Sequence, residues 1–151
     1  MENEWQSYDV EVTHLFGASP AQVYDAWLDP DLICAWFGPG LGQTLPVEVD
    51  ASVGGKFRIV QIRDGQAVGH SGYYLVLDRP HHIAFTWAMD DDDGYSEVRI
   101  ALAPKDTGTQ VRLVHAIGEQ WQAYEAQVKQ AWSTMMAEME SLLVNDNPSQ
   151  A

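Results

Sequence analysis

Cysteine is almost absent from this sequence, which has only Cys34 in 151 residues. An internal disulfide and a metal site built from several thiolates are therefore excluded. No apolar run approaches the roughly 20 residues that a membrane-spanning helix needs. The segment Met1–Trp5 lacks the basic and apolar regions of a secretory signal peptide. These features favour a cytoplasmic protein.

Basic residues are also scarce, since eight Lys and Arg accompany 22 Asp and Glu and give a formal charge of −14. Proteins bind nucleic acids largely through Lys and Arg contacts to phosphate, so no nucleic-acid partner is expected. Anionic membranes are disfavoured for the same reason. The length fits one domain, 1–151, for which we predict an ordered core over about 6–144 and a polar tail at 145–151.

The first third of the chain predicts one strand followed by two short helices. Alternating apolar and polar residues indicate a strand over about 8–16. Ser19-Pro20 then supplies an N-cap and a first-turn proline for a helix that ends at Asp29-Pro30. A second short helix is expected over about 30–37, before Gly38-Pro39-Gly40.

From Leu45 onward the hydrophobic period is two, which is typical of strands. Asp64-Gly65 is a strong hairpin signal, and the short connections between successive strands indicate an antiparallel meander. Apolar residues at spacings of three and four, from Trp121 to Leu142, predict an amphipathic helix from about Glu119 to Val144.

Together these elements predict an α+β fold. We expect a curved antiparallel sheet of about seven strands wrapped on a long C-terminal helix, with two short helices after the first strand. A sheet with one apolar face needs a cover, and the long helix supplies it. Where the curvature of the sheet exceeds the reach of its side chains, a ligand-sized apolar cavity is expected.

The order of several motifs resembles a known family, the activator of heat-shock protein 90 ATPase homologue-like family of the START-like (SRPBCC) helix-grip superfamily. The resemblance is carried by Ala18–Trp27, Trp36–Pro39, Gly54–Phe57, Gly72–Leu75 and Phe85–Trp87. It covers nearly the whole chain and implies a helix-grip, hydrophobic-ligand-binding domain. It implies no particular activity, because fold does not fix function.

The residues expected to face the cavity are those in phase on the strands and on the helices that cover them. As ligand-binding residues we predict Trp36, Phe37, Phe57, Ile59, Gln61, Tyr74, Phe85, Trp87, Val98, Ile100, Leu113, His115, Tyr124, Val128, Trp132 and Met135. Trp121 is a further aromatic candidate for the wall. The alternative for such a set is ordinary core packing, although in this fold core residues also line the cavity.

Two polar residues in this set have alternative interpretations. His115 shares the phase of Val111 and Leu113, so it should point toward the long helix. It is either a polar anchor or general acid–base for a ligand, or a core-edge histidine bonded to backbone. Gln61 either orients a ligand or sits at a strand end in water. His115 is the one catalytic candidate.

No metal or cofactor is predicted. Adjacent side chains on a strand point to opposite faces, so His81 and His82 are poor joint ligands. The acidic run Asp90–Asp93 lacks the spacing of a calcium-binding loop. Cys34 is expected to be buried and inert.

Three functional hypotheses follow. The first is a binding or carrier domain for a small hydrophobic or aromatic molecule, acting as a monomer or homodimer. The second is a cyclase- or dehydratase-like enzyme that uses His115 and a tyrosine hydroxyl on a polyketide or aromatic substrate. The third is a stress-related, co-chaperone-like interaction protein. The third is placed last because the eukaryotic co-chaperones of the family carry an N-terminal domain that is not seen in this sequence.

Overall fold

The structure is a computed structural model that describes residues 7–92 and 94–145. These residues form an eight-stranded antiparallel sheet, three α-helices and one 3-10 helix. In chain order the elements are β1 (Ser7–Phe16), α1 (Pro20–Leu28), α2 (Pro30–Trp36), β2 (Gln43–Thr44), β3 (Glu48–Val49), β4 (Lys56–Arg63), β5 (Gln66–Asp78), β6 (His82–Met89), β7 (Ser96–Lys105), β8 (Gly108–Gly118), η1 (Glu119–Tyr124) and α3 (Glu125–Asn145). The predicted tail from 146 onward lies outside the described residues.

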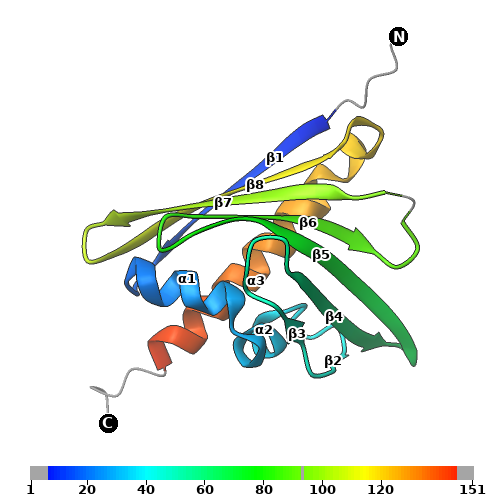
Figure 1. The fold of residues 1–151 in the computed structure, drawn as a ribbon, viewed down its shortest axis with the longest axis horizontal. Coiled ribbons are helices and arrows are strands. Elements are labelled where there is room, and N and C mark those ends of the chain that lie inside the picture. Colours follow the sequence, from blue (N-terminus) through cyan, green and yellow to red (C-terminus); the bar gives the residue numbers. More distant parts are fainter. Residues whose placement is uncertain (1–6, 93, 146–151) are drawn as a thin grey trace.

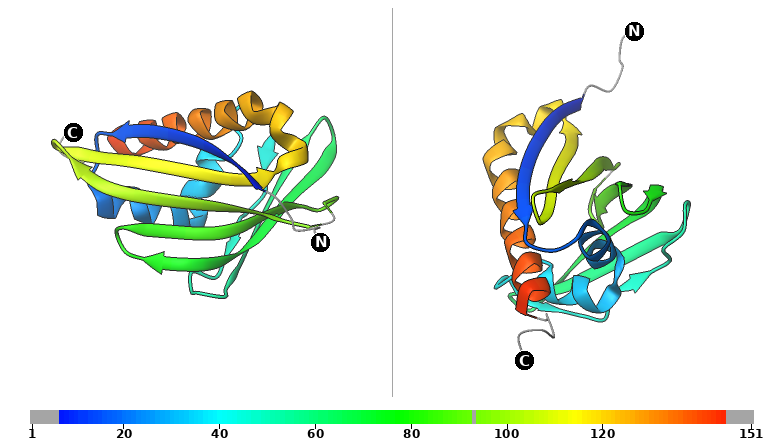
Figure 2. Two further views of the ribbon diagram at one scale, coloured as in Figure 1. Left: turned by 90° about the horizontal axis from the view of Figure 1, so that it is seen from above. Right: turned by 90° about the vertical axis from the view of Figure 1, so that its left-hand side faces the viewer.

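The strands form a meander in the order β1-β8-β7-β6-β5-β4-β2, and β3 also pairs with β4. The sheet bends strongly and α3 runs inside the bend, closest to β1 (Figure 2). Helices α1 and α2 lie below the sheet and contact α3 (Figure 1). The predicted helix-grip fold is therefore confirmed, and the described residues add one short strand, β2, to the seven expected.

Local sequence signals place the two short helices where the pattern predicts them. Ser19 and Gln22 form a capping box, in which each side chain accepts a hydrogen bond from the other residue's backbone N–H. The Asp29 carboxylate caps α2 by accepting from the N–H of Asp31 at 2.9 Å. Because Asp29 is also the C-cap of α1, one residue ends the first helix and starts the second.

The apolar core lies between the inner face of the sheet and the three helices. Trp132, Met135, Met136 and Met139 of α3 are all buried against it, and each buried apolar side chain of this size contributes about 1.5–3 kcal/mol. Two hydrogen bonds also link α3 to β1. The Tyr8 hydroxyl donates to Glu125 at 2.8 Å, and His14 Nε2 contacts Glu140 at 2.7 Å.

The start of the long helix differs from the prediction. The pattern predicts a helix from Glu119, but α3 begins at Glu125 and the six preceding residues form η1. A 3-10 helix has three residues per turn, so Trp121 and Tyr124 leave the buried stripe. They are 53% and 51% exposed, and their ring centroids lie 5.8 Å apart.

Candidate functional site

Aromatic rings fill most of the space between the helices and the sheet. The ring centroids of Trp27 and Trp36 lie 5.2 Å apart, and those of Trp87 and Trp132 lie 5.5 Å apart. The Phe57 ring stacks on Trp87 at 6.0 Å. Such contacts add stability beyond the burial of area. The interior under α3 is therefore packed with side chains for most of its length.

An open recess of about 600 Å³ lies at one end of this interior. It is bordered by the β6–β7 loop, the end of β8, η1 and the first turn of α3. Its lining residues are Trp87, Met89, Asp91, Asp92, Gly94, Tyr95, Ser96, His115, Ile117, Gly118, Gln120, Trp121, Tyr124 and Val128. The volume, and a lining that includes four Trp and Tyr side chains, are those of a site for a small organic molecule.

The predicted ligand-binding residues divide between this recess and the core behind it. Trp87, His115, Tyr124 and Val128 line the recess. The others are buried in the core, namely Trp36, Phe37, Phe57, Ile59, Gln61, Tyr74, Phe85, Val98, Ile100, Leu113, Trp132 and Met135. A ligand that contacted this second group would have to displace packed side chains.

His115 at the recess is held by hydrogen bonds on both ring nitrogens. The Trp132 Nε1–H donates to Nδ1 at 3.1 Å, so Nδ1 carries no proton. The neutral ring must then carry its proton on Nε2, which lies 2.7 Å from Ser96 Oγ. The Ser96 hydroxyl in turn donates to the Trp87 carbonyl at 3.2 Å. The histidine is thus oriented by side chains. The interpretation of His115 as a core-edge histidine bonded to backbone is therefore corrected.

Burial lowers the pKa of His115 to about 4, because the imidazolium would lose its hydration. Protonation of the ring would also add a proton to Nδ1, which already accepts the hydrogen bond from the Trp132 indole N–H. At neutral pH the residue is therefore an uncharged imidazole. It can offer polarity to a bound molecule without adding a positive charge to the recess.

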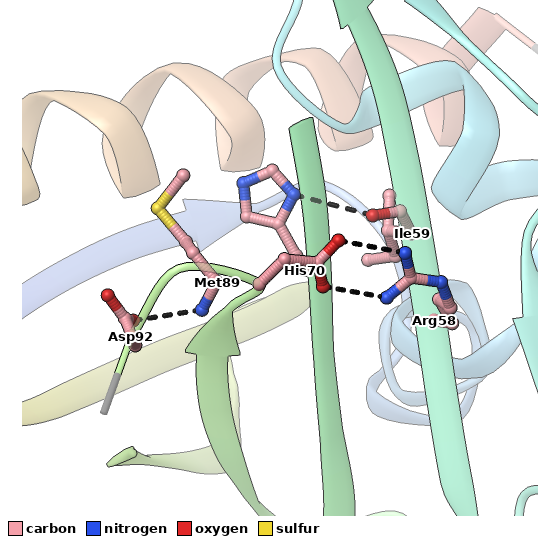
Figure 3. Close-up of polar contacts among 6 residues, drawn as sticks. Arg58, Ile59, His70, Met89 and Asp92 are labelled. Atoms are coloured by element: carbon pink, nitrogen blue, oxygen red, sulfur yellow. Dashed lines mark hydrogen bonds and ion pairs between the residues drawn. The ribbon is translucent and has the colours of Figure 1, made fainter. Parts of the chain in front are cut away.

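The β6–β7 loop that forms the rim of the recess is tied to the sheet. The Arg58 guanidinium makes two hydrogen bonds of 2.9 Å to the Asp90 carboxylate. The Met89 N–H donates to Asp92 Oδ2 at 2.9 Å (Figure 3). Gly69 allows the ion pair to cross β5, because a Cβ there would lie 2.2 Å from Asp90 Oδ2. The rim is therefore pre-positioned by the fold.

Comparison with known proteins identifies the family. A profile described as "Activator of Hsp90 ATPase homolog 1-like protein" matches residues 17–144. The chain belongs to this family. No curated protein matches the chain.

Solved structures share the fold of this family member. A protein from Chromobacterium violaceum is 27% identical, with a TM-score of 0.80 over 89% of this chain and 96% of its own. A protein from Rhodobacter sphaeroides is 21% identical, with a TM-score of 0.83 over 95% of this chain and 100% of its own. DynU16, described as a protein in the dynemicin biosynthetic locus, is 18% identical, with a TM-score of 0.75 over 93% of this chain and 49% of its own.

Gln61 in this family member serves the core and not the recess. Its amide nitrogen contacts the Gly38 carbonyl at 3.0 Å and Thr44 Oγ1 at 3.1 Å, and its oxygen accepts from Arg63 Nε at 2.6 Å. The side chain is 1% exposed. Neither sequence interpretation, a ligand contact or a solvated strand end, describes this arrangement. The amide instead attaches the segment after α2 to β4.

Two polar residues near the recess were not singled out by the sequence pattern. His70 is buried, its Nδ1 lies 3.4 Å from the Ile59 carbonyl, and its ring contacts Phe37 and Trp87. Burial lowers its pKa. Its alternation with Tyr74 on β5 was the signal that could have located it. Ser96 gave no such signal, because it stands at the first position of its strand.

The other residues and motifs considered in the sequence form no catalytic or metal site among the described residues. Burial raises the pKa of Tyr74, so its hydroxyl stays protonated. Cys34 is only partly buried, and its Sγ lies 3.4 Å from the Thr44 carbonyl. Within residues 7–92 and 94–145, no group of three or more His, Cys, Asp or Glu could hold a metal ion. In the same part of the chain, no helix is both long and apolar enough to cross a membrane.

A wider depression of about 1240 Å³ lies on the outer face of the sheet. Two of its charged lining residues already have partners, since Arg112 pairs with Glu11 at 2.6 Å and Arg99 pairs with Glu97 at 2.8 Å. Its remaining lining includes buried core residues such as Ile83 and Ile100 as well as residues that face outward, among them Leu75 and Tyr95. This depression is the outer surface of a twisted sheet, and the smaller recess is the better site.

Proposed function

We propose that this protein binds or carries a small hydrophobic or aromatic molecule in the recess beside η1. The observation that carries the proposal is a concavity of about 600 Å³ lined by Trp87, Tyr95, Trp121 and Tyr124. Soluble proteins rarely leave several large aromatic side chains together at the surface unless they contact a ligand or partner. DynU16, which shares the fold, is described as belonging to a biosynthetic locus, and this supports a small organic ligand by analogy of fold alone.

The polar groups of the recess support orientation of a ligand. His115 and Ser96 lie at the recess with their hydrogen bonds arranged in one direction, from Trp132 through His115 and Ser96 to Trp87. A ligand hydroxyl or N–H that approached Ser96 would meet a fixed hydrogen-bond acceptor in a mostly apolar wall, because the Ser96 proton is already donated to the Trp87 carbonyl. This combination of apolar area with a few placed polar groups is typical of small-molecule sites.

A catalytic role is a second candidate, favoured by the 2.7 Å contact between Ser96 and His115. In the tautomer described above, however, both nitrogens are engaged and His115 has no free lone pair to take a proton from Ser96. A nucleophilic serine needs such a base. We therefore place binding before catalysis.

The test is a ligand screen with a matched pair of variants. Tyr124 in the recess and Tyr73 on the outer face of β5 are both 51% exposed. Thermal-shift and native mass-spectrometry screens of small aromatics, lipids and polyketides should yield a binder for the natural protein. Tyr124→Ala should weaken that binder at least tenfold, and Tyr73→Ala should leave its affinity unchanged.

Two outcomes would contradict the proposal. One is the absence of any binder, and the other is equal affinity of both variants for every binder found. His115→Ala, tested with each binder for conversion to product as well as for affinity, separates binding from catalysis. An enzyme would lose turnover while retaining the ligand, whereas a carrier has no turnover to lose.

A further inference from the structure

The charge of the recess restricts the kind of molecule that it can hold. Among its described lining residues there are two carboxylates, Asp91 and Asp92, and no Lys or Arg. His115 adds no charge at neutral pH, as shown above. An anionic ligand would therefore meet two like charges without a compensating cation, whereas a positive group would be attracted to them.

The neighbouring loop residues explain why these two carboxylates remain uncompensated. Arg58, which forms an ion pair with this loop, makes both of its hydrogen bonds to Asp90. Asp92 uses one oxygen to accept the Met89 N–H, which fixes the carboxylate without neutralising its charge. Asp91 has no hydrogen bond or ion pair among the described residues and is exposed at the rim.

The aromatic walls of the recess favour a positive group as well. Trp121 and Tyr124 are half exposed, their ring planes are inclined at 48°, and Trp87 and Tyr95 contribute to the same lining. The face of an aromatic ring attracts an alkylammonium group, and Trp does so most strongly. The aromatic rings and the carboxylates around the recess thus both favour the binding of a positive group, and they do so through independent interactions. The formal charge of −14 adds long-range attraction for a cation.

We infer that the recess selects organic cations, specifically aromatic or hydrophobic molecules that carry an amine or quaternary ammonium group, over neutral and anionic molecules of the same shape. The apolar part of such a ligand contacts Trp87, Ile117 and Val128. Its ammonium group lies near Trp121, Tyr124 and the carboxylates of the β6–β7 loop. This inference rests on the proposed binding function and specifies its ligand class.

The experiment compares three probes that share one naphthylmethyl group and differ in charge. They are (naphthalen-2-ylmethyl)trimethylammonium, its neutral isostere 2-neopentylnaphthalene, and naphthalene-2-acetate. Binding to the natural protein is measured by calorimetry and by quenching of tryptophan fluorescence. We expect the cation to bind at least tenfold more tightly than the neutral isostere, and the carboxylate to bind more weakly than both. The advantage of the cation should shrink as salt is raised, because exposed charges are screened.

A double variant isolates the role of the rim. Asp91→Asn with Asp92→Asn should reduce the preference for the cation to less than threefold, while affinity for the neutral probe stays the same. The control is Asp31→Asn with Asp106→Asn, which removes the same number of charges from exposed positions on α2 and on the β7–β8 turn. It should preserve the preference.

The outcomes separate this inference from the binding proposal. If the neutral or anionic probe binds as tightly as the cation, and that binding is lost in Tyr124→Ala, the recess is a binding site and the selection for cations is wrong. If none of the three probes binds, the inference is overturned, whereas the binding proposal fails only if the wider screen of aromatics, lipids and polyketides also yields no binder. Equal loss of preference in the two double variants would also overturn the inference, because net charge alone would then explain it.

Discussion

The indole N–H of Trp132 on α3 donates a hydrogen bond of 3.1 Å to Nδ1 of His115 on β8. This contact joins the long helix to the sheet at the point where the packed interior gives way to the recess. It also fixes the tautomer of the histidine, since a nitrogen that accepts cannot carry the proton. The contact therefore links the stability of the fold to the chemistry of the candidate site.

Removing the donor should release the histidine. In Trp132→Phe we expect the pKa of His115 to rise above its value of about 4. The reason is that a proton added to Nδ1 would no longer meet the indole N–H of Trp132. The loss of a buried hydrogen bond should also destabilise the fold by about 1–3 kcal/mol. The measurement is an NMR titration of the histidine ring together with urea unfolding.

Trp36→Phe is the matched control for that variant. It also removes a buried indole N–H, which donates to the Ala26 carbonyl at 3.0 Å, but this bond does not involve His115. Its stability should fall similarly while the titration of His115 stays unchanged. The interpretation fails if both variants shift the histidine equally.

The stability of the protein should depend on pH through His115. Its folded pKa of about 4 lies below the ordinary histidine pKa of 6.5, so between these values the unfolded chain binds a proton that the folded chain does not. The contribution is present above pH 6.5 and is lost as the pH falls toward 4. It amounts to about 3 kcal/mol. His70, whose pKa burial also lowers, acts in the same direction.

A non-titrating variant isolates this contribution. Between pH 7.5 and 4.5 the free energy of unfolding of the natural protein should fall by about 2–3 kcal/mol more than that of His115→Gln. Carboxylates and His70 titrate in both proteins and cancel in the comparison. Parallel pH curves for the two proteins would show that His115 is not buried as described.

Gln61 should be a determinant of stability rather than of binding. In Gln61→Leu the carbonyl of Gly38 and the hydroxyl of Thr44 lose the amide that contacts them. Unpaired buried polar groups are costly, so we expect a loss of about 2–3 kcal/mol in urea unfolding. Gln66→Leu, at an exposed position of the same hairpin, should change stability by less than about 0.5 kcal/mol. Equal effects of the two variants would contradict the described hydrogen bonds.

Gly72 should tolerate no side chain. A Cβ at this position would lie 1.9 Å from the Thr86 carbonyl oxygen and 2.7 Å from two atoms of the Phe57 ring. The carbonyl belongs to the backbone of β6 and cannot move without breaking the sheet. Gly72→Ala should therefore destabilise the fold by about 3 kcal/mol.

Gly94→Ala provides the comparison for this variant. Its added Cβ would meet no atom of the described residues within 4 Å, so stability should change by less than about 0.5 kcal/mol. Unfolding midpoints in urea, with unchanged slopes, measure both variants. A tolerated alanine at position 72 would show that β5 and β6 are farther apart than described.

The sequence determined the architecture, because the signals for it act over a few residues. The caps Ser19 and Asp29, the Asp64-Gly65 turn and the alternation that points His115 toward α3 all depend on neighbours in the chain. Together they were sufficient to predict the order of strands and helices and the helix-grip fold. The family resemblance agrees with them over residues 17–144.

Only the tertiary structure decided where the site lies, because its contacts join residues that are far apart in the chain. The partners of His115, Gln61 and Asp90 come from other elements, and no local pattern specifies them. Trp121 and Tyr124 lie in η1 and not on the buried face of the predicted long helix, so they are exposed at the recess. Hydrophobic periodicity can say which face of an element is buried, but the position of an opening depends on how the elements pack.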